Sequence, residues 1–289
     1  MLQKAQSARD EFHSLLFFLI HHTFILQEQS TWWPYLNLLP TIFNQKNAHP
    51  LWFNTDQLDF LAGSDLRNRI LNYQKKVSQT YASLLNDPDV VRALSPVFTF
   101  DHYMWAHSIL DARSIWWDGK RHLVPLLDFV NCEASKDIHS VHESSSDTTG
   151  KYVETKARKN VLAGEQVFED YGQPNHIYFL YHGFILDNNL HDCALIDDLS
   201  ISSDGQVYSV GEKSRRRLHV NGFNNLNPSF CIKSGASSEL DNLANFLRIK
   251  RNIPGDNIGI TDDICQEVVD VIKLRLRRYI VDNYTDEEI

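Results

Sequence analysis

Two segments near the middle of the chain hold the residues best suited to chemistry. The segment HLVPLLDFVNC (122–132) is an apolar run that leads to Asn131, and GEQVFEDYGQPNHIYFLYHGF (164–184) places Tyr171 directly before Gly172. Glycine permits a sharp backbone turn, so the Tyr171 hydroxyl can face a cleft and orient an amine. The Asn131 amide can both donate and accept hydrogen bonds, which suits an amino-acid-like ligand. Taken alone, a Tyr-Gly pair usually ends a strand, and an Asn at a strand end usually forms a turn.

Two charged residues stand close to these segments in the sequence. Asp128 lies within the apolar run, where an unsatisfied carboxylate is costly, so it is either a structural hydrogen-bond hub or part of a site. Arg113 follows Asp111 at the end of a predicted helix. It can cap the last carbonyls of that helix or reach the carboxylate of a ligand.

Metal, hydrolase and nucleotide chemistry lack their usual signatures. The chain has 13 histidines, but His139, His142 and Glu143 fall in a polar segment without a third and fourth ligand at the usual spacing, and we expect no metal site. His176 and His182 are a second candidate pair of metal ligands, but we expect His182 to line the same cleft that Tyr171 faces. The sequence contains no G-x-S-x-G, G-x-G-x-x-G or G-x-x-x-x-G-K motif.

Composition indicates a soluble globular protein and excludes a general binder of polyanions. The 289 residues are 43% hydrophobic and 22% charged, and the net charge is −9, whereas nucleic-acid affinity rests on clustered Lys and Arg. The apolar segment 15–26 is interrupted by His21-His22 and is shorter than a membrane span, so it predicts a buried helix. The four cysteines are far apart in sequence, which favours a reducing compartment, cytoplasmic or nuclear.

Periodicity predicts a mixture of helices and short strands. Thr99 stands at a helix N-cap position with Asp101 in the first turn, so a helix is expected over 100–112. Polar residues at 139–150 predict an exposed loop, and the Gly/Asn/Ser-rich stretch 221–238 could be a linker. A final helix is expected from Thr261. The other predicted elements are helices at 8–27, 56–86 and 175–182 and strands at 123–130, 152–157 and 165–170.

The order of several motifs resembles one known family. PLLDFVNC, GEQVFEDYG and NHIYFLYHGF, preceded by TWWPYLNLLP (31–40) and FDHYMWAHSILDAR (100–113), are similar to the SET domain of the Rubisco-methyltransferase-like family. The resemblance covers about residues 10–197. It implies an α+β fold with small curved sheets, a helical insertion and a helical C-terminal lobe that holds protein substrates. We therefore expect a SET domain over 1–214 with the insertion at about 40–112, and the helical lobe over 215–289.

The same resemblance implies an activity, a cofactor and the residues of a site. The chain would be a monomeric protein-lysine N-methyltransferase that uses S-adenosylmethionine, with no nucleic-acid or membrane partner. Tyr171 would be catalytic. Arg113 would sit at the junction of cofactor and substrate, and the expected cofactor contacts are Asp128, Phe129, Val130, Asn131, Cys132, His182, Gly183 and Phe184.

Two departures from the family pattern leave alternatives open. Cys132 replaces the usual His, and the first SET strands, with their Gly-containing cofactor loop, are expected before residue 10, where nothing of that kind is present. A protein-interaction module that has lost cofactor binding is therefore the second hypothesis. In the actin-histidine methyltransferases of the same family, a Trp and an Asn shape the histidine pocket. Leu127 and Ile115 stand at these positions here, which favours lysine as the target.

Overall fold

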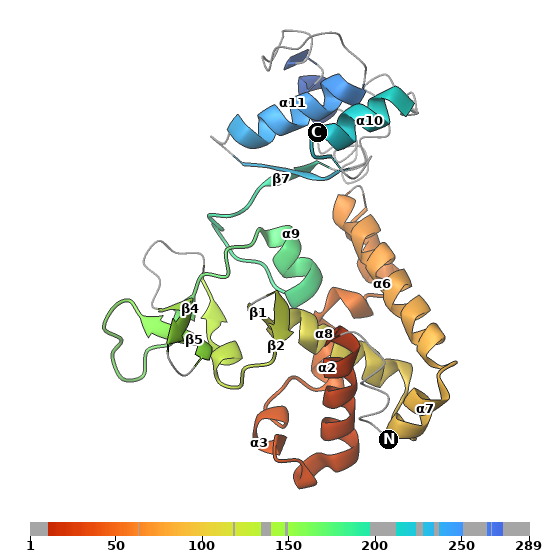
Figure 1. Ribbon diagram of the computed structural model, residues 1–289, viewed down its shortest axis with the longest axis vertical. Coiled ribbons are helices and arrows are strands. Elements are labelled where there is room, and N and C mark those ends of the chain that lie inside the picture. Colours follow the sequence, from red (N-terminus) through yellow and green to blue (C-terminus); the bar gives the residue numbers. More distant parts are fainter. Residues whose placement is uncertain are drawn as a thin grey trace. The chain divides into compact units, whose positions relative to one another are not determined.

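The computed structural model divides into two compact units (Figure 1). It describes residues 11–62, 64–117, 119–133, 140–147, 150–196, 212–223, 228–233, 237–250, 265–266 and 268–273. The first unit comprises Met1–Gln57 and Asn68–His191, and the second comprises Leu58–Arg67 and Asp192–Ile289. Helices and small sheets occur together, so the predicted α+β class is confirmed.

Helices make up the larger part of the first unit. The predicted N-terminal helix appears as α2 (Glu11–Ile20), which continues as a π-helix (His21–Leu26) and a 3-10 turn (Gln27–Gln29). Leu16, Phe17, Leu19 and Ile20 are buried, as the apolar pattern predicted. The expected insertion at 40–112 is helical and begins with a capping box at Thr41. The helices after α2 are α3 (Trp33–Leu36), α4 (Ile42–Ala48), a 3-10 turn at Pro50–Trp52, α5 (Thr55–Asp59), α6 (Asp65–Leu84), α7 (Pro88–Leu94) and α8 (Phe100–Arg113).

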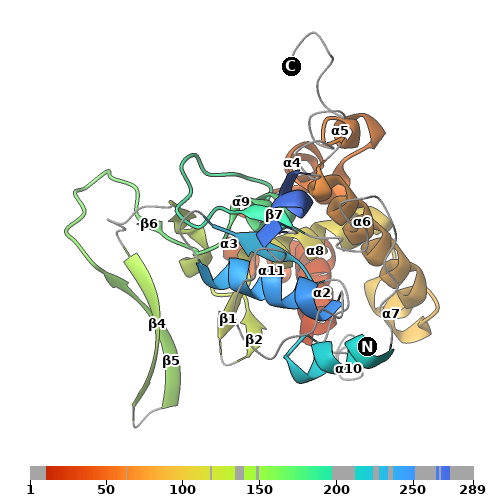
Figure 2. The same cartoon turned by 90° about the horizontal axis from the view of Figure 1, so that it is seen from above.

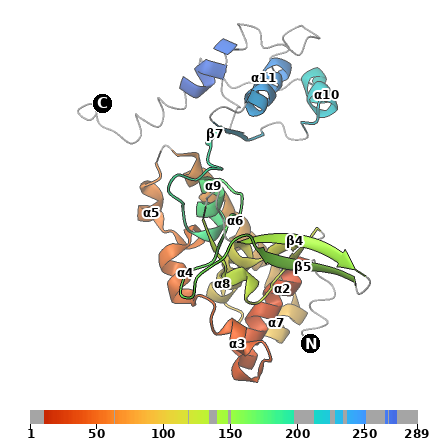
Figure 3. The same ribbon diagram turned by 90° about the vertical axis from the view of Figure 1, so that its left-hand side faces the viewer.

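Helix α8 is the central helix of the first unit and packs against α2 (Figure 3). It begins where the sequence predicted, because the Thr99 hydroxyl accepts a hydrogen bond from the His102 amide. Asp101 in its first turn forms an ion pair with Lys46 of α4 at 2.6 Å. Trp105 is buried and donates through Nε1 to the Pro40 carbonyl at 2.7 Å, which fixes α8 to the start of the helical insertion.

The sheets are small, and two strand predictions need correction. β1 (Ile115–Trp117) pairs with β2 (Lys120–His122), and the second sheet has the order β3-β6-β4-β5. The expected strand at 123–130 is a turn and a 3-10 segment (Leu127–Phe129), because Pro125 and the positive φ of Leu126 (75°) break extended structure. The expected loop at 139–150 contains a strand. The strands of the second sheet are β3 (Asn131–Cys132), β4 (Ser140–Asp147), β5 (Gly150–Ala157) and β6 (Phe168–Glu169).

Strands β4 and β5 form a long antiparallel hairpin that projects from the helices of the first unit (Figure 2). Its register runs from Ser140 opposite Ala157 to Asp147 opposite Gly150. Polar composition suggested a loop, but an antiparallel hairpin whose two faces are both in solvent needs no apolar alternation along its strands. His142 and Glu143, which we weighed as metal ligands, lie in β4, and His139 lies outside the described residues.

A short helical segment follows the Tyr171 turn, as predicted. It consists of α9 (Asn175–Ile177) and a π-helix (Tyr178–His182) that ends at Gly183. Buried His49 holds it, since Nδ1 accepts from the Leu51 amide while Nε2 lies 3.0 Å from the Tyr181 carbonyl. This arrangement assigns His49 as a neutral ring, and burial lowers its pKa. Gly183 adopts a left-handed conformation against the backbone of Ala48.

The second unit has its own core. β7 (Ala194–Ile196) pairs with β8 (Phe230–Ile232), and β8 falls inside the stretch considered as a linker. The unit comprises Asp192–Ile289 as well as Leu58–Arg67, whereas the sequence predicted a helical lobe over 215–289. Helices α10 (Glu212–Val220) and α11 (Ser237–Lys250) pack on each other. Thr261 lies outside the described residues, although 268–273 are helical. The buried core contains Ile196, Leu218, Phe230, Leu243, Phe246, Leu247, Ile249, Val268 and Val271.

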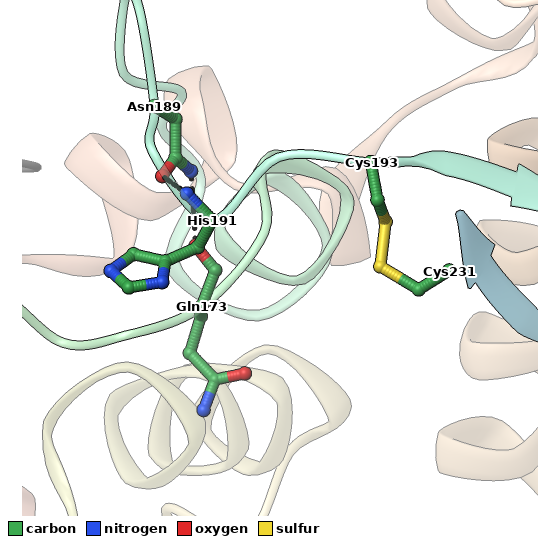
Figure 4. Close-up of a disulfide and its surroundings, with 5 residues drawn as sticks. All are labelled: Gln173, Asn189, His191, Cys193 and Cys231. Carbon is green, nitrogen blue, oxygen red and sulfur yellow. Dashed lines mark hydrogen bonds between the residues drawn. A yellow bond between two sulfur atoms is a disulfide. The ribbon is translucent and has the colours of Figure 1, made fainter. Parts of the chain in front are cut away.

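A disulfide joins Cys193 to Cys231 within the second unit (Figure 4). It links the neighbourhood of β7 to β8, where Leu195 lies opposite Cys231. The sequence spacing favoured unpaired cysteines in a reducing compartment, and this pair differs from that expectation because strand pairing brings the distant residues together. Among the described residues, no helix is long and apolar enough to cross a membrane.

We predict that Gly183→Ala destabilises the first unit by more than Gly164→Ala does. Both glycines have positive φ (77° and 92°), which costs a residue with a Cβ roughly 1–2 kcal/mol. A Cβ at Gly183 would also lie 3.1 Å from the Ala48 carbonyl oxygen, whereas none of the atoms described lies within 4 Å of one at Gly164. Urea unfolding of both variants measures the difference. Equal losses would show that the close approach at Gly183 does not matter.

Candidate active site

The two segments singled out in the sequence meet in the first unit. β3 and β6 pair in parallel, with Asn131 opposite Phe168 and Cys132 opposite Glu169. Tyr171 comes two residues after β6, and its hydroxyl donates a short hydrogen bond to the Val130 carbonyl. The predicted proximity of the Asn131 segment and the Tyr171 turn is therefore confirmed.

A cavity of about 1080 Å³ opens beside this junction within the first unit. It reaches from the Tyr171 turn along α8 to residues of α2 and α6. Half of the ten residues predicted for the site line it: Arg113, Asp128, Val130, Tyr171 and His182. Apolar and charged side chains thus share one hollow, as expected of a ligand site.

Arg113 and Asp128 form the charged pair of the cavity. The Asp128 side chain is only 1% exposed, and its Oδ2 accepts from the Tyr35 hydroxyl at 2.8 Å and lies 3.6 Å from Arg113 Nη1. Arg113 also donates to the Asp128 carbonyl at 3.2 Å and lies over the Phe129 ring. Asp128 Oδ1 is buried and has no hydrogen-bond partner among the described residues. Burial raises the pKa of Asp128, and the Tyr35 hydrogen bond and Arg113 only partly oppose this.

Tyr171 is a protonated phenol at neutral pH. Burial raises its pKa to about 12, and the neighbouring Cys132 and Glu169 act in the same direction. Because its hydrogen is donated to the Val130 carbonyl, a lone pair of the oxygen remains to accept a hydrogen bond from the cavity. Tyr171 can therefore orient a donor group but does not act as a base.

His182 lines the cavity next to Tyr171, as predicted. Its ring lies 6.0 Å from the Tyr171 ring and contacts Tyr178 and Phe184 edge to face. Burial lowers the pKa of His182, and a hydrogen bond with the Ala112 backbone partly offsets this. The side chain therefore contributes a largely neutral ring to the wall of the cavity.

The other five predicted residues are not among those that line the cavity. Phe129 packs on Tyr35 and under Arg113, and Asn131 is exposed. The Cys132 thiol lies 3.4 Å from the Tyr178 hydroxyl, and burial raises its pKa. Phe184 stacks on Tyr178, and Gly183 faces the backbone of Ala48. The structure therefore gives these five residues packing or surface positions, and not positions in the cavity wall.

Sequence reasoning missed a polar network in the same cavity. The buried Asp111 carboxylate accepts from the Tyr73 hydroxyl at 2.6 Å and lies 3.2 Å from both His107 Nδ1 and Arg121 Nη1. Burial alone would raise the pKa of Asp111, but His107, Tyr73 and Arg121 outweigh it and lower the pKa. His107 and Asp111 stand four residues apart on α8, a spacing that could have signalled the pair.

Aliphatic side chains also line the cavity that Tyr171 lines. Ile115, at the start of β1, and Leu127, in the 3-10 turn, both line the cavity. Neither offers a hydrogen bond to a bound side chain. A basic group that enters here loses water without gaining a polar partner from these two residues.

We predict that Asp128→Asn increases the stability of the folded protein. A folded-state pKa above the usual value means that the ionised carboxylate is less favourable in the folded protein than in the unfolded chain. The cost is present at neutral pH and disappears at acid pH, where the carboxyl group is protonated in both states. Thermal unfolding at the two pH values measures it, with exposed Asp187→Asn as the control. A loss of stability at neutral pH would contradict the assignment.

Curated relatives are similar over part of the chain. No family model matches. The actin-histidine N-methyltransferases of Xenopus tropicalis and Gallus gallus are both 29% identical over 198 residues, and the one from Homo sapiens is 28% identical over the same length. Each match covers 63% of this chain, which spans 31% of the length of these relatives.

Solved structures share the fold over nearly the whole chain. The structure of Rubisco LSMT bound to AdoMet has a TM-score of 0.71 at 18% identity. The match covers 98% of this chain and 68% of the Rubisco LSMT chain. The SET domain of LSMT bound to MeLysine and AdoHcy has a TM-score of 0.72 at 20% identity and covers 96% and 66%. The chain therefore has the SET fold, and by sequence and structure it resembles the SET proteins of the Rubisco-methyltransferase-like family.

Proposed function

We propose that this chain is an S-adenosylmethionine-dependent protein N-methyltransferase whose target is a lysine side chain. The observation that carries the proposal is the meeting of Tyr171 with the Arg113–Asp128 pair around one cavity. The SET fold and the names of similar proteins support it. Methyl transfer needs orientation and exclusion of water more than acid–base groups, and a cavity lined by a largely buried phenol and by aliphatic side chains suits that need.

The residues present fit the amino-acid portion of S-adenosylmethionine. Asp128 Oδ1 is a buried acceptor without a partner, which suits an α-ammonium group. Arg113 presents a guanidinium to the same cavity, which suits an α-carboxylate. When bound, the cofactor would supply a methyl group on a positively charged sulfur. The partly buried Arg113 and the buried Asp128 would hold it in this cavity.

Tyr171 would orient the target amine. Its hydrogen is held by the Val130 carbonyl, so its oxygen accepts a hydrogen bond from the amine and fixes the direction of the nitrogen lone pair. A lysine ammonium must lose a proton before it can attack. Ile115 and Leu127 favour that loss, because an environment without water disfavours the charged form.

The same aliphatic wall supports the proposal of lysine over histidine as the target. An imidazole must be held in one tautomer, so a histidine site needs a polar partner for its second ring nitrogen. Ile115 and Leu127 provide none, whereas a lysine chain can pack its methylenes against them. The curated relatives are named as histidine enzymes, and two of the similar solved structures are described with lysine or methyllysine. We therefore test both targets.

Calorimetry and a methyl-transfer assay on the purified chain test the proposal. We expect saturable heat on titration with S-adenosylmethionine and a dissociation constant in the micromolar range. A dissociation constant of 1 μM corresponds to a binding free energy of roughly −8 kcal/mol. We also expect transfer of labelled methyl groups to lysine-containing peptides, with less to peptides in which histidine replaces lysine. No heat at millimolar cofactor would rule out the methyltransferase hypothesis for this chain. Transfer to histidine alone would overturn the choice of target.

We predict that Tyr171→Phe lowers the rate of methyl transfer roughly a hundredfold, because a misoriented amine loses the benefit of positioning. The affinity for S-adenosylmethionine should stay within about twofold, because the phenol is assigned to the target and not to the cofactor. Tyr81→Phe is the matched control, since Tyr81 also donates to a backbone carbonyl, that of Phe98, and is not among the lining residues. Single-turnover kinetics give the rates. Unchanged turnover in Tyr171→Phe would remove the proposed role.

A further inference from the structure

The segment 186–191, which we call the strap, binds the turn that carries Tyr171. His191 Nε2 lies 2.7 Å from Asp170 Oδ2. Asn189 donates to the Gln173 carbonyl at 3.0 Å and accepts from the His191 amide at 2.9 Å (Figure 4). Asn175, at the other end of the turn, donates to the Leu186 carbonyl and accepts from its amide, both at 3.0 Å.

The turn needs such support because the sheet ends before it. β6 has only two residues and stops at Glu169, so the ladder does not hold Asp170 or Tyr171. Gly172 has a positive φ of 69°, and a glycine at this point allows many other conformations. Without further contacts, the Tyr171 side chain would be free to turn away from Val130.

Asp170 connects the strap to both sides of Tyr171. Its Oδ1 accepts from the Gly172 amide at 2.8 Å, and its Oδ2 faces His191. The Asp170 carboxylate thereby connects the amide that follows Tyr171 to His191. Asp170 lines the cavity, whereas its partner His191 is not among the lining residues.

We infer that His191 is a positioning residue, which acts through Asp170 to hold the Tyr171 hydroxyl against the Val130 carbonyl, with Asn189 supporting the same turn. This inference rests on the proposed function for its effect on rate. The effect of His191 on the titration of Tyr171 can be measured without any activity. A Tyr171 side chain that is no longer held becomes more exposed to water, and its pKa moves closer to the usual value.

The experiment compares His191→Ala, His191→Gln and the control His219→Ala, which changes an exposed histidine of α10. NMR of the ring Cζ carbons of labelled tyrosine follows the titration of Tyr171, whose signal is identified by its loss in Tyr171→Phe. In the wild type and in His219→Ala, the pKa of Tyr171 should be about 12. In His191→Ala it should fall toward 10, the ordinary value. His191→Gln should restore it, because an amide N–H can reach Asp170.

Kinetics then separate positioning from general damage. We expect His191→Ala to lower kcat roughly tenfold or more while the affinity for S-adenosylmethionine changes less than about twofold. In the Tyr171→Phe background, the same substitution should cost little more, since its effect passes through the missing hydroxyl. Additive losses would show a merely structural role and overturn the inference.

The outcomes distinguish this inference from the proposed function. An unchanged Tyr171 titration in folded His191→Ala overturns the inference, whatever the activity. A lowered pKa of Tyr171 in a chain that neither binds S-adenosylmethionine nor transfers methyl groups supports the inference and overturns the proposed function. Circular dichroism establishes that each variant is folded.

Discussion

The parallel pairing of β3 with β6, closed by the hydrogen bond from Tyr171 to the Val130 carbonyl, is the interaction on which the site depends. It joins segments about 40 residues apart with only two strand residues on each side. Such a short ladder contributes little stability by itself. The helices and the strap around it must therefore hold it in place, and the long helix α8 and the π-helix that ends at Gly183 supply that frame.

The cavity combines an apolar wall with charges that are unfavourable when left alone. Asp111 is satisfied by three partners, and its pKa is lowered. Asp128 has one unpartnered oxygen, and its pKa is raised. The pKa values of two buried carboxylates in one cavity are thus shifted in opposite directions. The first stabilises the fold, whereas the second keeps an unused acceptor, which is typical of a group reserved for a ligand.

The sequence predicted local features well and distant pairing less well. Thr99 caps α8, and the apolar face of α2 is buried, because both depend on neighbouring residues. The motif order also predicted that Asn131 and Tyr171 lie together. It could not show that Asn131 is exposed, that Leu127 belongs to a turn, or that Cys193 pairs with Cys231, since these follow from tertiary contacts. The network around Asp111 was missed for the same reason, since Tyr73 and Arg121 reach it from other elements.

The π-helical form of Tyr178–His182 has a consequence for variation among similar chains. Such a segment is wider than an α-helix and is commonly associated with functional sites. It presents the adjacent residues Tyr181 and His182 to the same hollow. Loss of a single residue here would tighten the coil and rotate one of the two away, while the flanking backbone kept its path. An insertion or deletion of one position can therefore change the shape and polarity of this pocket, a route to new selectivity that does not require any side-chain replacement.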